Sequence, residues 1–91
     1  GSDQLRSGDW LLSQYAISQD NGKLVINGTV QNSGSKAAST DLTVYYYVDG
    51  QAVAVATGST GEVAPGASAN VTLTSDDAWQ PGNPVLVVEA S

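Results

Sequence analysis

Residues 41–57, DLTVYYYVDGQAVAVAT, decide the fold that this sequence predicts. Apolar and polar side chains alternate on both sides of Asp49-Gly50, and such alternation is typical of a half-buried β-strand. An Asp-Gly pair between two alternating segments favours a two-residue hairpin turn, because both turn positions require a positive φ. The segment therefore predicts two antiparallel strands, over 41–48 and 51–57, joined by a tight turn.

The two-residue turn also sets which side chains of this hairpin share a face, because directly opposed residues lie on the same side of a sheet. One face is apolar and is expected to be the core face, with the pairs Val48–Gln51, Tyr46–Val53, Val44–Val55 and Leu42–Thr57. The opposite face then carries Tyr45 and Tyr47 against Ala54 and Ala52.

A second turn pair, Asn21-Gly22, predicts another hairpin, which ends in the alternating segment 24–32. Its register places Tyr15 over Gly28, which has no side chain to occupy the same space. The apolar residues nearer the N-terminus have the opposite parity along the first strand. This change of parity predicts a bulge or a change of sheet near Ser13-Gln14.

The C-terminal half continues the pattern of short strands and turns. Residues 58–61 predict a turn and a short edge strand, and Ala64-Pro65-Gly66-Ala67 predicts a type II turn, since Pro and Gly hold its central positions. A strand is expected over 67–74 and a loop over 75–84. A final strand, over 85–89, is expected to be covered by the sheet on both faces.

About seven short strands, mostly antiparallel, are typical of an immunoglobulin-like β-sandwich. The chain has 91 residues and no cysteine, so the expected sandwich is all-β, small and without a disulfide. Residues 1–9 are expected to be a tag remnant and linker, and residues 10–91 a single domain.

Composition excludes several classes of function. Three basic and nine acidic residues give a net charge of −6, whereas nucleic acids and anionic membranes attract chiefly Lys and Arg. A membrane-spanning helix needs about 18 consecutive apolar residues, and no apolar run in this sequence approaches that length. His and Cys are absent, and they are the usual neutral-pH bases, thiol nucleophiles and transition-metal ligands. We therefore expect no enzyme, no catalytic residue, no metal, no cofactor, no nucleic acid and no membrane contact.

Residues 24–74 carry three turn motifs whose order and spacing resemble a known family. The strand LVINGTVQN runs into Asn32-Ser33-Gly34, the next strand ends on Val48-Asp49-Gly50-Gln51, and Val63-Ala64-Pro65-Gly66-Ala67-Ser68 leads into NVTLT. Together these residues resemble the cell-adhesion-related domain of bacteria and archaea (CARDB), and also the FxLYD-type immunoglobulin-like domains. The sequence departs from the family pattern at Leu73, where an aromatic residue is common.

The resemblance implies a seven-stranded extracellular or cell-envelope sandwich of a bacterial or archaeal protein, without catalytic residues. Such modules usually occur in tandem or appended to enzymes and adhesins. The expected function is that of a spacer or an adhesion and protein-interaction domain within a larger surface or secreted protein. Its partners would be neighbouring domains of the parent chain or another surface protein. An accessory role in an enzyme or a secretion machine is a third hypothesis.

Tyr45 and Tyr47 are the first candidate binding residues. Two positions apart on one strand, they lie on the same face, opposite small alanines. Tyrosine provides a large rigid contact area and a hydroxyl group, so this face is a candidate docking surface for a domain, a partner protein or a sugar ring. The structural interpretation of the same residues is ordinary packing of tyrosine over alanine.

Trp79 lies among Asp76, Asp77, Gln80 and Asn83. An aromatic ring beside carboxylates and amides is the chemistry of a carbohydrate site. The alternative function is therefore a glycan-binding (carbohydrate-binding) module, with Trp79 and the two tyrosines as stacking platforms. The same oxygens could hold Ca²⁺, although their spacing matches no calcium-loop signature. The structural interpretation is that Trp79 closes one end of the sandwich while the acids are solvated.

Asn27 and Asn70 each begin an Asn-X-Thr sequon, on faces predicted to point outward. Three-residue motifs of this kind are frequent by chance, so the two sequons are treated as noise.

Overall fold

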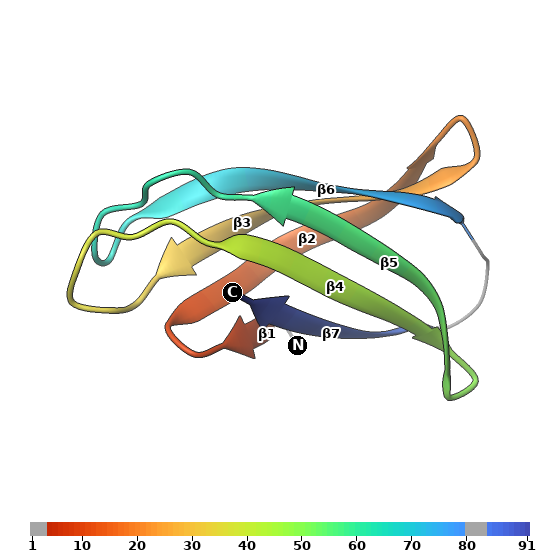
Figure 1. Cartoon of the computed structure of the whole chain (residues 1–91), viewed down its shortest axis with the longest axis horizontal. Coiled ribbons are helices and arrows are strands. Elements are labelled where there is room, and N and C mark those ends of the chain that lie inside the picture. The colour runs from red at the N-terminus through yellow and green to blue at the C-terminus, as the bar shows by residue number, and fades with distance from the viewer. Residues whose placement is uncertain (1–3, 80–83) are drawn as a thin grey trace.

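The computed structural model describes residues 4–79 and 84–91, which form seven strands and no helix (Figure 1). In chain order the strands are β1 (Gln4–Ser7), β2 (Trp10–Asp20), β3 (Lys23–Asn32), β4 (Asp41–Val48), β5 (Gln51–Ser59), β6 (Ser68–Ala78) and β7 (Val85–Ala90). All their pairings are antiparallel. The predicted all-β fold is confirmed. Over the described ranges there is accordingly no helix long and apolar enough to cross a membrane.

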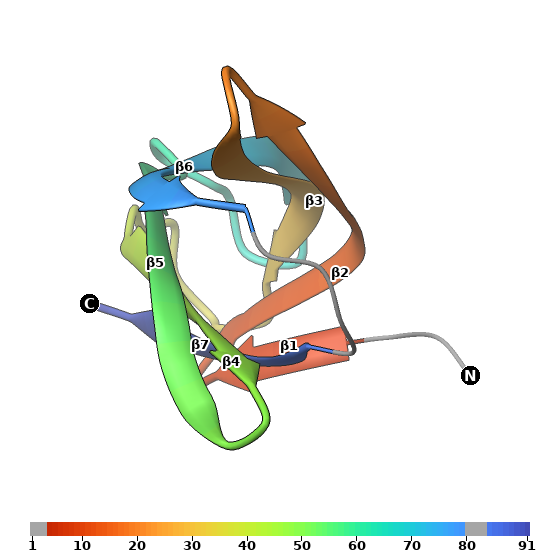
Figure 2. The ribbon, with the colours of Figure 1, turned by 90° about the vertical axis from the view of Figure 1, so that its right-hand side faces the viewer.

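The strands form one continuous sheet in the order β1-β2-β3-β6-β5-β4-β7. A single residue pair, Thr57–Thr74, joins β5 to β6. At this junction the sheet folds over, so that β2 and β3 lie across the interior from β4 and β5 (Figure 2). The result is a two-layered, barrel-like immunoglobulin-type sandwich, with principal extents of 37 × 26 × 21 Å.

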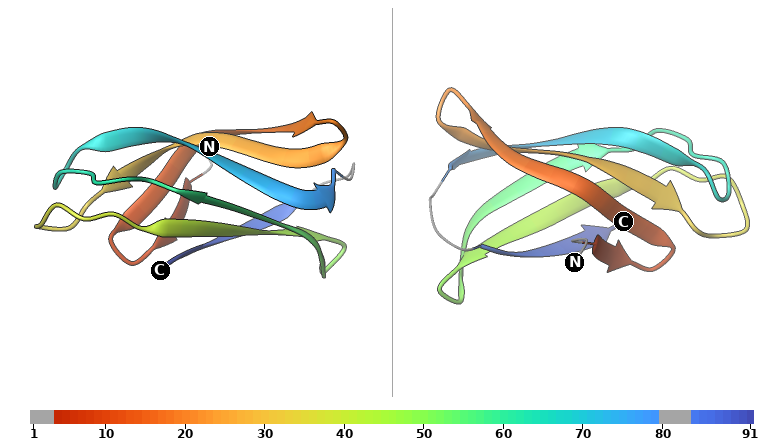
Figure 3. Two further views of the ribbon diagram at one scale, coloured as in Figure 1. Left: turned by 45° about the horizontal axis from the view of Figure 1, so that its top comes forward. Right: turned by 180° about the vertical axis from the view of Figure 1, so that it is seen from behind.

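The two ends of the sheet return to each other. β1 and β7 lie side by side in the front and back views (Figures 1 and 3), and the backbone N–H of Ala90 donates a hydrogen bond to Ser7 Oγ at 3.0 Å. Residues 4–7, within the segment expected to be a linker, thus form an edge strand, and Leu5 packs against the core.

The core lies between the layers and is built from alternate residues of the inner strands. Its most deeply buried side chains are Leu12, Leu24, Ile26, Val30, Leu42, Val44 and Leu73. Tyr46 is only 2% exposed, whereas Tyr45 and Tyr47 are half-buried. Each fully buried Leu, Ile or Val contributes about 1.5–3 kcal/mol. The prediction that even-numbered residues of β4 point into the core is confirmed.

The hairpin of β2 and β3 has the predicted register near its turn. Asn21 and Gly22 both have a positive φ, and Ile17 pairs with Ile26. Further along, the pairing shifts in a bulge that contains Gln14, whose φ is 51°. The bulge predicted from the change of parity is therefore confirmed, and it turns both halves of β2 toward the core.

Gly28 lies under this bulge, as the predicted register requires. A Cβ at Gly28 would lie 3.1 Å from Tyr15 Cβ and 2.9 Å from Leu12 Cδ1. Contacts this short leave room only for glycine unless both neighbours move, so the absence of a side chain lets the two halves of β2 approach β3.

The hairpin of β4 and β5 keeps the predicted turn but departs from the predicted register. Asp49 and Gly50 have φ values of 53° and 81°, and Val48 pairs with Gln51. Past the next pair, Val53 is left without a partner, and all later pairs shift by one residue. These pairs are Tyr46–Ala54, Tyr45–Val55, Val44–Ala56 and Leu42–Gly58.

The small residues on the inner side of β5 explain this shift. Ala54 and Ala56 are buried, whereas Val55, expected in the core, is 37% exposed. A Cβ on Gly58 would lie 2.5 Å from the backbone oxygen of Thr72 on β6. The predicted core position of Val55 is therefore wrong, because the sharp fold of the sheet between β5 and β6 admits only small side chains on its inner side.

The turn after β5 is partly as predicted. In Ala64-Pro65-Gly66-Ala67, the last N–H donates to the first C=O at 3.0 Å, and Gly66 has a φ of 78°, as a type II turn requires. Residues 58–61 do not form a short strand of their own, because β5 continues to Ser59. The next pairing is an isolated bridge, Ala38–Val63.

The predicted loop over 75–84 is shorter than expected. β6 continues to Ala78, which pairs with Lys23, so the ladder with β3 extends past the last alternating residue. Three residues of β6, from Ser75 to Asp77, stand opposite Leu24 alone, and this irregularity hides the strand from an analysis of alternation.

The last strand is also less covered than expected. β7 is the edge of the sheet and pairs only with β4. Its inner residues Leu86 and Val88 are buried, while Val85 and Val87 are 65% and 47% exposed. The expectation that both faces are covered was wrong, because no described segment packs over the outer face of β7.

Candidate functional site

The outer face of β5, β4 and β7 carries a group of apolar side chains, here called the outer apolar patch: Tyr45, Tyr47, Val55, Val85 and Val87. Val55 and Val87 flank Tyr45, because both pair with it across the sheet, and Val85 pairs with Tyr47. Opposed residues of this kind have Cβ atoms about 4.5–5.5 Å apart. The patch is therefore one continuous surface that spans three strands.

This surface confirms one prediction and corrects another. Tyr45 and Tyr47 share the outer face, as their spacing predicts. Ala52 pairs with Tyr47 as expected, but Ala54 is buried and Val55 takes its place beside Tyr45. The register shift thus replaces a small neighbour with a larger apolar one and enlarges the exposed surface.

Four carboxylates border the outer apolar patch. Glu89 lies two residues beyond Val87 on β7, Asp41 begins β4, Asp49 lies in the β4–β5 turn, and Asp77 contacts β5 from β6. β4, β5, β7 and the β4–β5 turn contain no Lys or Arg. No basic side chain of the described residues forms an ion pair with any of these four acids. The patch is therefore an apolar centre with an acidic rim.

Asp77 connects β6 to β5. Its Oδ2 accepts a hydrogen bond from the backbone N–H of Val55 at 3.1 Å. The N–H of Asp77 donates to Ser75 Oγ at 2.9 Å, and Ser75 Oγ donates back to Oδ2 at 3.3 Å. Asp76 instead lines a shallow hollow beside Lys23. The two acids therefore serve different sides of β6 and form no carboxylate pair.

Of the predicted cluster around Trp79, the structure describes Asp76, Asp77 and Trp79. The backbone N–H of Trp79 donates to the oxygen of Gly22 at 2.8 Å, and the side chain is 36% exposed. The interpretation of Trp79 as a buried plug is therefore wrong. Gln80 and Asn83 lie outside the described residues. Over the part of the chain that the structure describes, no three acidic side chains gather in a way that could hold a metal ion.

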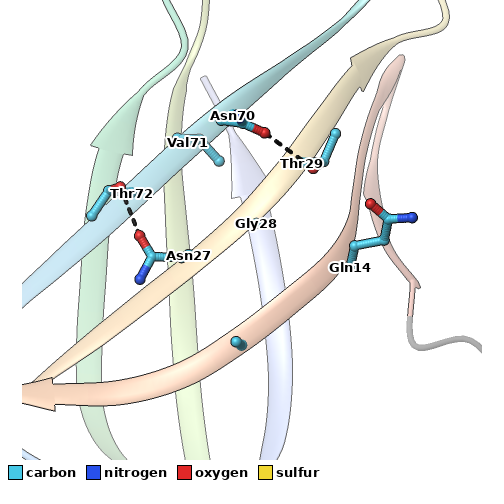
Figure 4. A pocket seen from close by; sticks show the side chains of 8 residues that line it. Gln14, Asn27, Gly28, Thr29, Asn70, Val71 and Thr72 are labelled. Carbon is cyan, nitrogen blue, oxygen red and sulfur yellow. Dashed lines mark hydrogen bonds between the residues drawn. The ribbon is translucent and has the colours of Figure 1, made fainter.

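A second surface feature lies on the opposite layer. A hollow of about 370 Å³ is lined by residues of β2, β3 and β6 (Figure 4). Across it, Thr72 Oγ1 donates to Asn27 Oδ1 at 2.8 Å, and Thr29 Oγ1 donates to Asn70 Oδ1 at 3.4 Å. Both sequon asparagines thus face outward, as predicted. The lining contains no charged or aromatic side chain, so the hollow offers neither acid–base groups nor a stacking surface.

Comparison with known proteins places the chain in a family. A family model described as CARDB matches residues 13–90. The chain belongs to the CARDB family. This match confirms the resemblance seen in the turn motifs, and it spans most of β2 and all later strands. CARDB domains are generally found in surface proteins of bacteria and archaea. No curated protein and no solved structure matches the chain.

Asn32 explains why one turn motif of this CARDB domain contains an asparagine. Its side chain is buried, with 2% of its surface exposed. Nδ2 donates to the backbone oxygens of Lys36 at 2.8 Å and Val63 at 2.9 Å, and Oδ1 accepts from the N–H of Gly34 at 2.9 Å. One side chain thus joins the loops that leave β3 and β5, so the motif has a structural role.

Three residues of the outer apolar patch were not predicted as site residues: Val55, Val85 and Val87. The signal for β7 was present, because four apolar residues in VLVVE cannot all face inward on an edge strand. The signal for Val55 was weaker. In β5, alanine alternates with valine, so either the alanines or the valines could face the core. How closely β6 approaches β5 determines which of the two sets is buried.

Proposed function

We propose that this CARDB domain is a non-catalytic, extracellular module that binds another protein through the outer apolar patch. It would form part of a larger surface or secreted protein of a bacterium or archaeon and serve there as an adhesion unit or spacer. The partner is another surface protein or a neighbouring domain of the parent chain. Nucleic acids and membranes are not its partners.

One observation carries this proposal: the outward-facing row of Val55, Tyr45 and Val87, in which both valines are exposed and Tyr45 is half-buried. The outer face of an antiparallel sheet ordinarily carries polar side chains. The opposite layer of this domain follows that rule, with Asn27, Thr29, Asn70 and Thr72 on its outer face. A contiguous exposed apolar surface marks an interaction site, and tyrosine is among the residues that contribute most to binding at such sites.

Two further features support the proposal. The domain is a two-layered sandwich, 37 Å long, that is stabilised by an apolar core and has no disulfide. This shape suits a rigid connecting unit. The sequence has no His and no Cys, which removes the commonest general bases and the thiol nucleophile. Both features favour a geometric role over a chemical one.

A carbohydrate-binding module is the second candidate. The exposed ring of Trp79 and the two outward tyrosines favour it, because aromatic rings can stack on sugars. The arrangement favours it less, since Trp79 follows β6 near the β2–β3 turn whereas Tyr45 and Tyr47 lie on β4. Two separate aromatic positions do not form one platform.

An adhesion assay tests the proposal. Beads coated with the 91-residue chain are incubated with cells of its source organism, and bound cells are counted. The variant Tyr45→Ser/Val87→Ser should bind at least about fivefold fewer cells, because it removes the centre of the patch. The matched control Asn70→Ser/Thr72→Ser, on the opposite layer, should bind like the wild type. Circular dichroism and thermal unfolding verify that each variant is folded.

Treatment of the cells separates a protein partner from a glycan. Protease treatment should abolish binding, and periodate oxidation of glycans should leave it intact. Binding that survives protease but not periodate, and that Trp79→Ala also abolishes, would establish the carbohydrate module instead. Equal binding by the patch variant and the wild type, or no binding by either, would contradict the proposed function.

A further inference from the structure

We infer that the partner of the outer apolar patch presents an apolar centre surrounded by basic side chains. The inference rests on the proposed function and adds the charge of the partner surface. It follows from where the ionisable residues lie around the patch, because a protein interface forms fastest and most specifically when the two surfaces carry complementary charge.

The charged residues of β4, β5, β7 and the β4–β5 turn are all acidic. Glu89 lies at the end of the patch where β7 ends, and it pairs with Thr43 of β4. Asp41 lies two residues before Thr43, at the start of β4. Asp49 lies at the opposite end, in the β4–β5 turn, and Asp77 lies at the β6 side. Carboxylates thus border the patch at both of its ends and along one side.

The three basic residues of the chain lie on other elements. Lys23 begins β3, Lys36 follows β3, and Arg6 lies on β1, which runs beside β7. None of them belongs to the strands that present the patch, and none pairs with a rim carboxylate among the described residues. The rim carboxylates are therefore unpaired by basic side chains of the described residues, and dissolved cations alone screen them in the free domain. They are available to basic groups of a partner.

Two of the rim carboxylates are held in place before any partner arrives. Ser59 Oγ donates to Asp41 Oδ1 at 2.6 Å, and the Val55 N–H donates to Asp77 Oδ2 at 3.1 Å. A fixed carboxylate loses little side-chain entropy on binding. When apolar side chains at the centre exclude water, the effective dielectric constant falls and each charge pair at the rim becomes stronger.

The same charges disfavour a second copy of this chain as the partner. Two copies joined through their patches would place like-charged rims against each other, and each copy carries a net charge of −6. Like charges brought together across an interface weaken binding. The free domain should therefore remain monomeric in spite of its exposed apolar surface.

A titration with two peptides tests the inference. The probes are two synthetic β-hairpins with the same Val and Tyr face, one flanked by Lys and the other by Glu. Binding to the ¹⁵N-labelled chain is followed by amide chemical shifts. The Lys-flanked hairpin should shift amides of β4, β5 and β7 and bind about tenfold more tightly than the Glu-flanked one. Its affinity should fall about fivefold when salt rises from about 0.02 M to about 0.5 M.

Two variants that each lose two negative charges show which carboxylates contribute to the affinity for the Lys-flanked hairpin. Asp49→Asn/Glu89→Gln removes two rim charges and should lower the affinity for the Lys-flanked hairpin at least about threefold at low salt. Asp20→Asn/Glu62→Gln removes two charges away from the three strands and should leave that affinity nearly unchanged. Both variants keep hydrogen-bonding side chains and alter exposed positions, so both should remain folded.

The outcomes separate this inference from the proposed function. If both hairpins shift the same patch amides with equal affinity, the basic partner is wrong, while the patch remains a binding surface. If neither hairpin shifts these amides, the inference fails and the adhesion assay alone decides the function. If sedimentation shows a dimer that Val87→Ser dissociates, the occupant is a second copy and the inference is overturned.

Discussion

Asn32 shows how one buried polar side chain can determine local structure. It satisfies two backbone oxygens and one backbone N–H of the loops around it. Its own backbone also takes part, since Gly66 N–H donates to its oxygen at 2.6 Å and its N–H donates to Ala67 at 3.1 Å. A buried polar group without a partner costs more than its hydrogen bond contributes.

We expect Asn32→Ala to lower the free energy of unfolding by about 2–4 kcal/mol, because three buried or half-buried backbone groups lose their partner. Urea denaturation followed by circular dichroism measures the change. Asn70→Ala is the matched control, since its amide is exposed and shares one long hydrogen bond, at 3.4 Å. The structural role of Asn32 is wrong if both variants lose the same stability.

The three consecutive tyrosines of β4 differ in their surroundings although their side chains are identical. Tyr46 is 2% exposed and lies in the core, so Tyr46→Ala should destabilise the fold by about 3–5 kcal/mol. Tyr45→Ala and Tyr47→Ala should each cost far less, because these rings are half-buried on the outer face. Thermal and urea unfolding of the three variants provides the comparison. A tolerant Tyr46 would show that the orientation of β4 is reversed.

The elements of the fold could be predicted where short-range turn chemistry determines them. Asn21-Gly22, Asp49-Gly50 and Pro65-Gly66 each form the turn that their φ requirements indicate. The bulge near Gln14 also follows from the sequence, because the parity of apolar residues changes there. These features depend on a few adjacent residues, so a single sequence is enough to find them.

The register of β5 could not be predicted, because a contact distant in sequence determines it. The close approach of Gly58 to Thr72 makes the inner side of β5 a place for alanine rather than valine. For the same reason, only part of the candidate site could be predicted. Tyr45 and Tyr47 were found by spacing, but Val55 became part of the site through the register shift at Val53. Asp77 was expected in a loop because the irregular end of β6 breaks the alternation.

The junction of β5 and β6 has few backbone bonds and should depend on Asp77. With Thr57–Thr74 as the one paired position, the carboxylate of Asp77 supplies a further link to Val55. In Asp77→Ala, the amide of Val55 should lose protection against hydrogen exchange, measured by NMR. Asp76→Ala is the matched control, because Asp76 makes no such bond. Unchanged exchange of Val55 in Asp77→Ala would contradict the link.

At the level of the whole molecule, membership of the CARDB family and the sandwich follow from the order of turns and strands. The family alone does not indicate which surface binds. That information comes from the contrast between the two outer faces, one with amides and hydroxyls and the other with valines and tyrosines. The contrast appears only when the register of β5 and the edge position of β7 are known.

The orientation of the Tyr45 ring tests this account most directly, because the binding surface exists only if the ring lies between Val55 and Val87. A nuclear Overhauser spectrum of the methyl-labelled chain measures this. We expect cross-peaks from the Tyr45 ring to the methyl groups of Val55 and Val87, and none to those of Leu24 or Leu73. Cross-peaks from the Tyr45 ring to these core leucines would contradict the outward orientation of Tyr45 and, with it, the binding surface.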